Sequence, residues 1–302
     1  MSNPVTHRGD QAARERRADA SSNDDDDRGS RAADLEPEEK KKASDEESLT
    51  AAITHEVIRR EGQKELERPM SALAWSGLAA GLSMGFSFVT EGLLRSHLPE
   101  TPWRPLVVKF GYPVGFLIVT LASQELYTEN TLRPIVPLMA KRTKELLRRV
   151  SMLWLVVLVT NLVGAALFAW VIAESDAFRP EVREAFRAIG REATEGTFPT
   201  VLIRAVFAGW LIALMVWMLP AAQSAQIAVI FMLTWIVGLA GLSHIIAGST
   251  AVMYAAFVGD IGFGEYLGDF MLPTLIGNTI GGASLVAALN HAQVASGGGK
   301  KN

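Results

Sequence analysis

The pattern of hydrophobic and polar positions divides this chain near residue 68. Residues 1–47 are charged and contain almost no large apolar side chain, which is typical of a disordered tail. Over residues 48–67, apolar positions such as Ile53 and Val57 recur at helical spacing beside a charged face, which predicts an amphipathic helix on a membrane surface. Apolar segments dominate 68–292, and a short polar tail follows over 293–302.

Six apolar segments within 68–292 are each long enough to cross a bilayer, which takes ~20 residues of helix. They cover 71–94, 106–131, 150–173, 201–219, 227–258 and 271–291. Residues 205–259 contain no Lys, Arg, Asp or Glu, and His244 is their one ionisable side chain apart from Tyr254. The pattern therefore predicts an all-α membrane protein with six transmembrane helices.

The charges between the segments predict the orientation. The link between the second and third segments is strongly basic, from Arg133 to Arg149, and basic links face the cytoplasm. With six spans, both termini are then cytoplasmic. The loop 174–200 is external, and its alternating charges at helical spacing predict a short, exposed helix.

Two of the segments are predicted to be interrupted. A helix over 227–258 would measure about 48 Å, whereas the hydrocarbon core is only ~30 Å thick. Gly248 and its neighbours over 247–250 are the expected break, one turn after His244. The second segment ends in a polar cluster over 124–130. Paired interruptions predict an inverted 3+3 repeat with a solute path at its interface; two unrelated kinks are the alternative.

Few side chains here offer chemistry inside the membrane. An intramembrane His244 is a functional candidate, although a structural histidine bridging two helices is the alternative. Arg204, Lys109 and Arg104 either attract an anion or extend to the interface. Glu125 and Glu129 either line the inner mouth or cap a half-helix.

The composition argues against an enzyme. The chain has no cysteine, which excludes disulfides, thiolate metal sites and cysteine nucleophiles. It also has no His-Glu-x-x-His motif, and its membrane-embedded histidine has no acid beside it. No metal, cofactor or nucleic-acid partner is expected. The expected partners are the lipid bilayer and a small solute.

Several fragments together resemble the formate/nitrite transporter family of six-span channels, across most of 68–292. They are Gly111-Tyr112-Pro113-Val114-Gly115, Glu125-Leu126-Tyr127-Thr128, Asn161-Leu162-Val163-Gly164-Ala165, Arg204 with Gly209-Trp210-Leu211 and Trp217, Gly241-Leu242-Ser243-His244, and Gly277-Asn278-Thr279-Ile280-Gly281-Gly282. Each fragment is short, and their order and spacing across six spans carry the resemblance.

The resemblance implies an aquaporin-like protomer with broken second and fifth helices, assembled as a homopentamer. It places His244 and Thr128 at the polar centre of the pore, with Asn278 nearby. Tyr127 stands where the family has a constricting Phe. Arg204, Glu125, Asn130 and Ser243 are expected to support the vestibule or the loops.

Departures from the family pattern place the chain in a divergent, uncharacterised branch of the bacterial inner membrane. Ser243 stands where formate and nitrite channels usually have Glu, and Gly248 stands within a segment that is usually Ala-Asn-Met. The expected function is a channel or transporter for small monovalent weak-acid anions. His244 would hydrogen-bond the permeant or protonate it. An aquaporin-like channel for neutral solutes is the alternative, although its Asn-Pro-Ala loops are absent.

Overall fold

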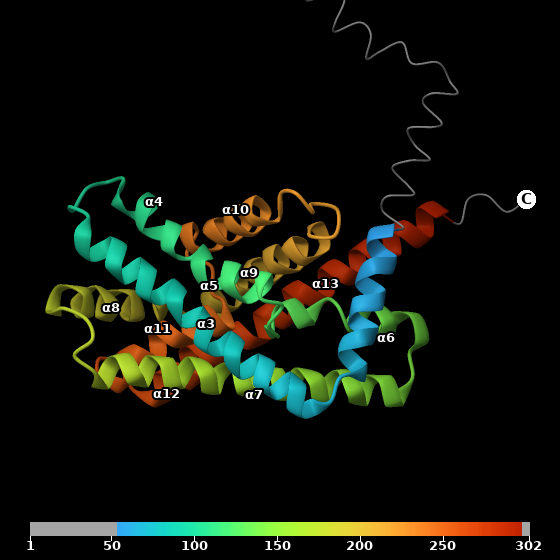
Figure 1. Cartoon of the computed structure of the whole chain (residues 1–302), viewed down its shortest axis with the longest axis horizontal. Helices are drawn as coiled ribbons and strands as arrows, with labels where there is room; N and C mark the ends of the chain where they lie inside the picture. Colours follow the sequence, from blue (N-terminus) through green and yellow to red (C-terminus); the bar gives the residue numbers. More distant parts are fainter. Residues whose placement is uncertain (1–52, 298–302) are drawn as a thin grey trace, which may run out of the picture. The chain divides into compact units, whose positions relative to one another are not determined.

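The computed structural model describes residues 53–297 (Figure 1). The chain divides into two units, Met1–Ile53 and Thr54–Asn302, and nearly all described residues belong to the second. The tail predicted over 1–47 lies outside the described residues. The tail predicted over 293–302 lies partly in the last helix, which continues to Gly297, and partly outside the described residues.

The described residues contain helices and no strand, so the predicted all-α fold is confirmed for them. A first helix covers 53–67. The helices that follow are α3 (Met70–His97), α4 (Arg104–Val108), η1 (Lys109–Gly111), α5 (Pro113–Leu121), η2 (Glu129–Thr131), α6 (Ile135–Lys141), α7 (Lys144–Glu174), α8 (Pro180–Ala193), α9 (Phe198–Met218), α10 (Gln226–Leu239), α11 (Ile245–Phe257), α12 (Phe263–Glu265), η3 (Tyr266–Met271) and α13 (Leu272–Gly297).

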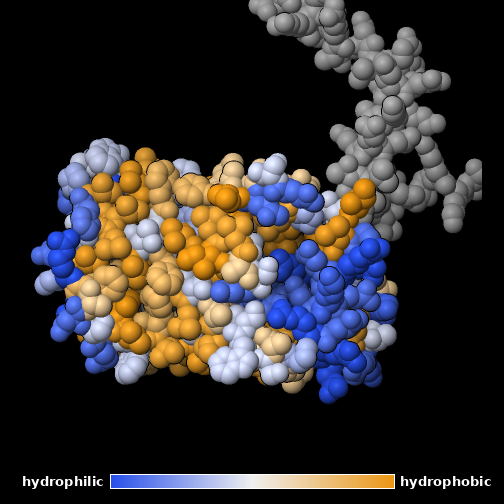
Figure 2. All heavy atoms as spheres, viewed as in Figure 1, coloured by the Kyte–Doolittle hydropathy of each residue, from blue (hydrophilic) through white to orange (hydrophobic). Residues whose placement is uncertain are grey.

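The helices carry the apolar outer face that a membrane protein requires. Four helical stretches of the described chain are long and apolar enough to span a bilayer, and α10 and α11 are shorter apolar helices. On α9, Ile203, Phe207 and Trp210 are exposed on one side, while Ala208 and Ile212 are buried on the other. Figure 2 shows an apolar band between hydrophilic residues gathered at the two ends of the face in view. Such a band matches the hydrocarbon layer.

Two helix pairs pack against each other most extensively, α3 with α7 and α9 with α13. Each pair meets at a glycine. A Cβ added to Gly81 on α3 would lie 2.1 Å from the carbonyl oxygen of Asn161 on α7. A Cβ added to Gly209 on α9 would lie 2.3 Å from the carbonyl oxygen of Asn278 on α13. Small residues at these points let the backbones approach closely.

The loop after α7 contains the predicted short helix, α8, but the helix is not exposed on all sides. Val182, Phe186 and Ile189 are buried on one face, which packs against α11 and α3. Phe186 also contacts the rings of Phe88 and Tyr254. The charge pattern marked the outer face correctly. The prediction of an exposed helix overlooked the apolar positions at i, i+4 and i+7, which make α8 amphipathic.

The helix over 53–67 (the amino-terminal helix) packs on the protein as well. Its buried face carries Ile58, Gly62 and Glu65, whereas Ile53 is exposed. A Cβ on Gly62 would lie 2.1 Å from the carbonyl oxygen of Arg133, so the helix touches the backbone just before α6. In Figure 1 the amino-terminal helix and α8 lie at opposite ends of the bundle.

Candidate functional site

Both long segments are interrupted, and the second interruption ends at His244. Helix α10 ends at Leu239, and the chain is not helical again until Ile245. Gly241 in this gap has φ of +60°, a left-handed conformation that glycine adopts without strain. His244 is the N-cap of α11, and its Nδ1 accepts a hydrogen bond from the backbone N–H of Ala247 at 3.2 Å.

The break therefore precedes His244, and the prediction of a break over 247–250 was wrong. These residues belong to α11, where they serve packing. A Cβ on Gly248 would lie 2.3 Å from the ring of Phe270. Ser249 Oγ pairs with the Tyr266 hydroxyl at 3.1 Å, and Thr250 Oγ1 donates to the carbonyl of Ile246. Small and hydroxyl residues are equally suited to close helix packing and to helix breaks, so composition alone did not separate the two.

The first interruption brings Thr128 to His244. Helix α5 ends at Leu121, the chain runs without regular structure to Thr128, and Ser123 there has φ of +52°. Thr128 Oγ1 lies 2.8 Å from His244 Nε2, and both side chains are buried. The edge of the Phe116 ring contacts the imidazole, with centroids 4.9 Å apart. The pairing of Thr128 with His244 expected from the sequence is thus present in the structure.

The hydrogen bonds assign the tautomer of His244. Nδ1 accepts from a backbone N–H, so the proton of the neutral ring is on Nε2. Nε2 then donates to Thr128 Oγ1. The hydroxyl hydrogen of Thr128 has no partner among the described residues and is available to an acceptor such as an anion.

Asn278 holds the second interruption against the bundle through three hydrogen bonds. Its Oδ1 accepts from the backbone N–H of Ile245 at 2.8 Å, while its Nδ2 donates to the carbonyls of Ala205 and Ser243 at 2.8 and 2.9 Å. Its side chain is fully buried, and all three bonds are to backbone groups. The Ile245 N–H and the Ser243 carbonyl belong to the interruption, where broken helices leave backbone groups without helical partners, so Asn278 satisfies what the break exposes.

Asn161 fastens the first interruption in the same way. Its Oδ1 accepts from the N–H of Tyr127 at 2.9 Å, and its Nδ2 donates to the carbonyls of Gly77 and Glu125 at 2.7 and 2.9 Å. The sequence interpretation did not assign Asn161 to the site. A signal was present, because Asn161-x-x-Gly164 and Asn278-x-x-Gly281 repeat one spacing in the third and sixth segments.

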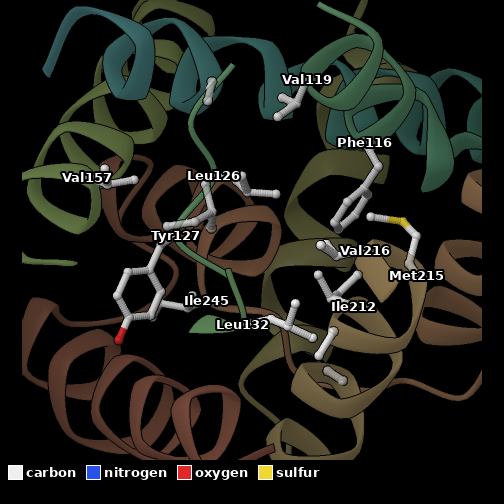
Figure 3. Packing of buried hydrophobic residues seen from close by; sticks show 14 of the residues in the cluster. Phe116, Val119, Leu126, Tyr127, Leu132, Val157, Ile212, Met215, Val216 and Ile245 are labelled. Atoms are coloured by element: carbon white, nitrogen blue, oxygen red, sulfur yellow. The ribbon is translucent and has the colours of Figure 1, made fainter. Parts of the chain in front are cut away.

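Tyr127 lies beside Thr128 and is held in one orientation. Its hydroxyl lies 2.9 Å from Thr279 Oγ1, which itself donates to the carbonyl of Leu275, so Tyr127 is the donor of the pair. Its ring also contacts Trp154 edge-on. Figure 3 shows the hydroxyl pointing away from Phe116 and Leu126. The tyrosine therefore presents its ring, and not its hydroxyl, to the apolar cluster.

A cavity of about 220 Å³ leads from α8 to His244. Ser243 and His244 line one end, and Arg204, Glu192 and Lys109 line the rest together with Glu91. We call it the α8-side cavity. Arg204 donates to the carbonyl of Glu195 and has no carboxylate partner among the described residues. Arg104 lies outside this cavity, where it pairs with Glu100 and lines a neighbouring cavity that Lys109 also lines. Of the described residues that line the α8-side cavity, Arg204 is thus the cation that is free to attract an anion.

A second cavity, of about 410 Å³, lies beside the amino-terminal helix. Glu125 pairs there with Arg68 and accepts from Asn130 Nδ2 at 2.8 Å. Glu129 pairs with Arg133 at 3.2 Å and accepts from Thr120. Among the described residues both glutamates bond other side chains and no backbone N–H at a helix start, so they belong to an ion-pair network in the second cavity.

Glu65 of the amino-terminal helix completes this network. Its Oε1 lies 3.1 Å from Arg133 Nη1, and its Oε2 is buried without a hydrogen-bond partner in the described chain. Burial raises the pKa of Glu65 to about 8, although Arg133 acts in the opposite direction. The helix therefore brings a proton-binding carboxyl to the second cavity.

The match to a family model decides the family. The model described as formate/nitrite transporter matches residues 52–292. The chain belongs to the formate/nitrite transporter family. The family consists of transporters and channels, so the protein is a membrane transport protein and not an enzyme, as the sequence predicted.

Relatives within the formate/nitrite transporter family agree with this assignment. Inner membrane protein YfdC of Escherichia coli (strain K12) is 41% identical over 244 residues, which are 81% of this chain and 79% of that protein. The formate channel BtFdhC of Bacillus thuringiensis is 27% identical over 246 residues, which are 76% of this chain and 90% of that protein. The resemblance to YfdC fits the inner-membrane branch that the sequence indicated.

Solved structures of the formate/nitrite transporter family show the same fold. A pentameric formate channel with formate bound superposes with a TM-score of 0.65 at 20% identity, covering 74% of this chain and 96% of that one. An ion channel of the family superposes with a TM-score of 0.60 at 19% identity, covering 80% of this chain and 96% of that one. The all-helical architecture is therefore the one that these channels share.

Proposed function

We propose that this protein conducts small monovalent weak-acid anions, of the formate or nitrite class, across the bacterial inner membrane. The observation that carries the proposal is the bond of 2.8 Å between Thr128 Oγ1 and His244 Nε2, at the point where the two interrupted segments meet. An ionisable side chain in a membrane segment is costly and marks solute paths. The names of the relatives BtFdhC and the pentameric formate channel support the substrate class.

The architecture of the pathway follows from the same residues. The two asparagines, Asn161 and Asn278, support an inverted 3+3 repeat, because each satisfies one interruption from the last helix of its half. The α8 side is the outer side and both termini are cytoplasmic by the basic link between the second and third spans. The chain assembles as a homopentamer, by analogy with the similar formate channel, which is pentameric.

Each site residue has a stated part in this pathway. Arg204 draws the anion into the α8-side cavity. The permeant then loses its water beside Phe116 and receives a hydrogen bond from the free hydroxyl hydrogen of Thr128. His244 fixes the orientation of that hydroxyl through Nε2–H. Tyr127 forms the apolar constriction beyond it, and Asn278 positions the backbone around His244.

Flux measurements in proteoliposomes test the proposal. A panel of formate, nitrite, acetate and lactate is measured from pH 5 to 8 with the native chain, His244→Ala and Thr128→Ala. We expect the anion flux to fall about 100-fold in both variants, which corresponds to ~2.7 kcal/mol of barrier. His97→Ala, at the exposed end of α3, and Thr250→Ala, within α11, are the matched controls and keep native flux.

Two outcomes contradict the proposal. Unchanged anion flux in both His244→Ala and Thr128→Ala removes the centre assigned here. Liposome swelling with glycerol in the absence of anion flux supports the neutral-solute channel instead. The swelling assay is performed on the same preparations, so a poorly reconstituted sample is recognised by the lack of either activity.

A further inference from the structure

Glu91 is a buried carboxylate in the α8-side cavity. It lies on α3, its exposed fraction is 3%, and its Oε2 is 2.6 Å from Lys109 Nζ. Lys109 is its one hydrogen-bond partner in the described part of the chain. A buried charge is tolerated when it is paired, so the pair holds Glu91 in place, and Lys109 is not free to attract an anion while it is bound.

His244 is poorly placed to exchange a proton with a permeant. Both of its ring nitrogens are engaged, Nδ1 by the N–H of Ala247 and Nε2 by Thr128. Protonation of Nδ1 would remove the N-cap of α11 and leave a buried N–H without a partner, which costs about 1–3 kcal/mol. A different group that faces the same cavity is better suited to carry a proton.

Two carboxyl groups line that cavity, Glu91 and Glu192. Glu192 is exposed for 48% of its side chain and pairs with Arg95 near the rim. Glu91 is enclosed and has a cation partner that can turn toward an incoming anion. Of the two, only Glu91 combines burial with an exchangeable partner.

We propose that Glu91 is the proton donor to the permeating anion, an inference that rests on the proposed anion transport. The incoming anion binds Lys109 Nζ in place of Glu91, and the released carboxylate takes one proton from a hydronium ion of the outer solution, which leaves a water molecule. The O–H bond of Glu91 then breaks as an O–H bond forms on the permeant oxygen. The neutral acid passes His244 and Phe116, and the Glu91 carboxylate returns to Lys109. One proton thus crosses with each anion.

The surroundings of Glu91 favour this exchange. The charged and titratable groups around it are Lys109, Arg95, Glu192, Tyr112, Arg204 and His244. Replacing the carboxylate by the incoming anion as the partner of Lys109 leaves the number of charges in the cavity unchanged, provided that Glu91 takes a proton. The cavity therefore admits an anion without a net gain of buried charge.

Proton uptake that accompanies a formate gradient tests the role of Glu91. A pH-sensitive dye enclosed in proteoliposomes reports proton uptake, while labelled formate reports flux. We expect Glu91→Gln to lower formate-driven proton uptake by roughly 100-fold and to flatten its pH profile, as loss of a general acid does. Glu91→Asp keeps a carboxyl and retains coupled uptake at a reduced rate. Glu184→Gln, on the exposed face of α8 and outside the cavity, is the control and retains native coupling.

A double variant distinguishes the loss of proton donation from a folding defect. Glu91→Gln alone leaves Lys109 without its partner, so Glu91→Gln/Lys109→Met, which removes both charges together, is measured beside it. Assembly is followed by size-exclusion chromatography. Native coupling in either assembled variant overturns the role of Glu91 and leaves anion transport standing. Absence of formate flux in the native chain overturns the proposed function itself, so the two failures are distinguishable.

Discussion

Asn161 and Asn278 make the same three hydrogen bonds at the two interruptions of the bundle. Each Oδ1 accepts a backbone N–H, from Tyr127 in one case and Ile245 in the other, at 2.9 and 2.8 Å. Each Nδ2 bridges a carbonyl of the interruption and a carbonyl of a neighbouring helix. Side chains of α7 and α13 therefore hold the backbone of the two interruptions, which carry Thr128 and His244, in place.

We expect Asn161→Ala and Asn278→Ala to destabilise the protein by about 2–4 kcal/mol each, because every variant leaves two buried backbone groups of an interruption, one N–H and one carbonyl, without a partner. The midpoint of thermal unfolding in detergent measures the effect. Ser284→Ala on α13 is the control, since Ser284 is exposed and bonds only within its own helix. If either asparagine variant unfolds at the same midpoint as Ser284→Ala, that asparagine does not stabilise its interruption.

The glycines beside these asparagines lead to a second prediction. Gly81→Ala and Gly209→Ala place a Cβ at 2.1 and 2.3 Å from backbone oxygens, so the helices must move apart. Overpacking of this kind costs about 1–3 kcal/mol or more. Gly264→Ala is the matched control, because its Cβ meets nothing within 4 Å. The yield of folded protein and the midpoint of thermal unfolding are measured for all three variants. Equal values would contradict the close approach of the helices at Gly81 and Gly209.

Glu65 leads to a prediction on pH. Its pKa is raised from 4.5 to about 8 when the amino-terminal helix is docked, so the docked state binds a proton that the undocked state has lost. Docking is therefore strongest below pH about 4.5 and weakens as the pH rises toward 8, by at most about 1.4 kcal/mol per unit. We expect hydrogen exchange over 53–67 to be slower at pH 5 than at pH 8, after correction for the intrinsic rate.

The Glu65→Gln variant has no carboxyl group at this position, so we expect it to remove most of the pH dependence of docking. Glu61→Gln is the control, because Glu61 contacts the same Arg133 from a half-exposed position. A pH dependence that persists in Glu65→Gln would assign it to another group of the network, of which Glu125 and Glu129 are the nearest members.

The sequence predicted the spans better than it predicted their interruptions. Hydropathy identified the long apolar helices because the hydrocarbon layer imposes the same requirement along a whole segment. The position of the fifth-span break was wrong by several residues, because Gly241 and Gly248 are both glycines in an apolar run. One accommodates a left-handed backbone and the other accommodates Phe270, and only tertiary packing distinguishes them.

The site was predicted in part for a similar reason. His244 was conspicuous because it is isolated among apolar residues, and the family resemblance supplied Thr128. Glu91 was overlooked, since a single acid near the end of α3 resembles an ordinary interfacial charge. Its partner Lys109 lies beyond the turn that follows, and a sequence pattern does not reveal that the two side chains meet.

The contact between Thr128 and His244 also has a consequence for biosynthesis. The two residues belong to different halves of the chain, and 116 positions separate them. Under the proposed transport function, Thr128 has no counterpart until the second half of the chain is in place, so the proposed pathway is complete only in the full-length protein.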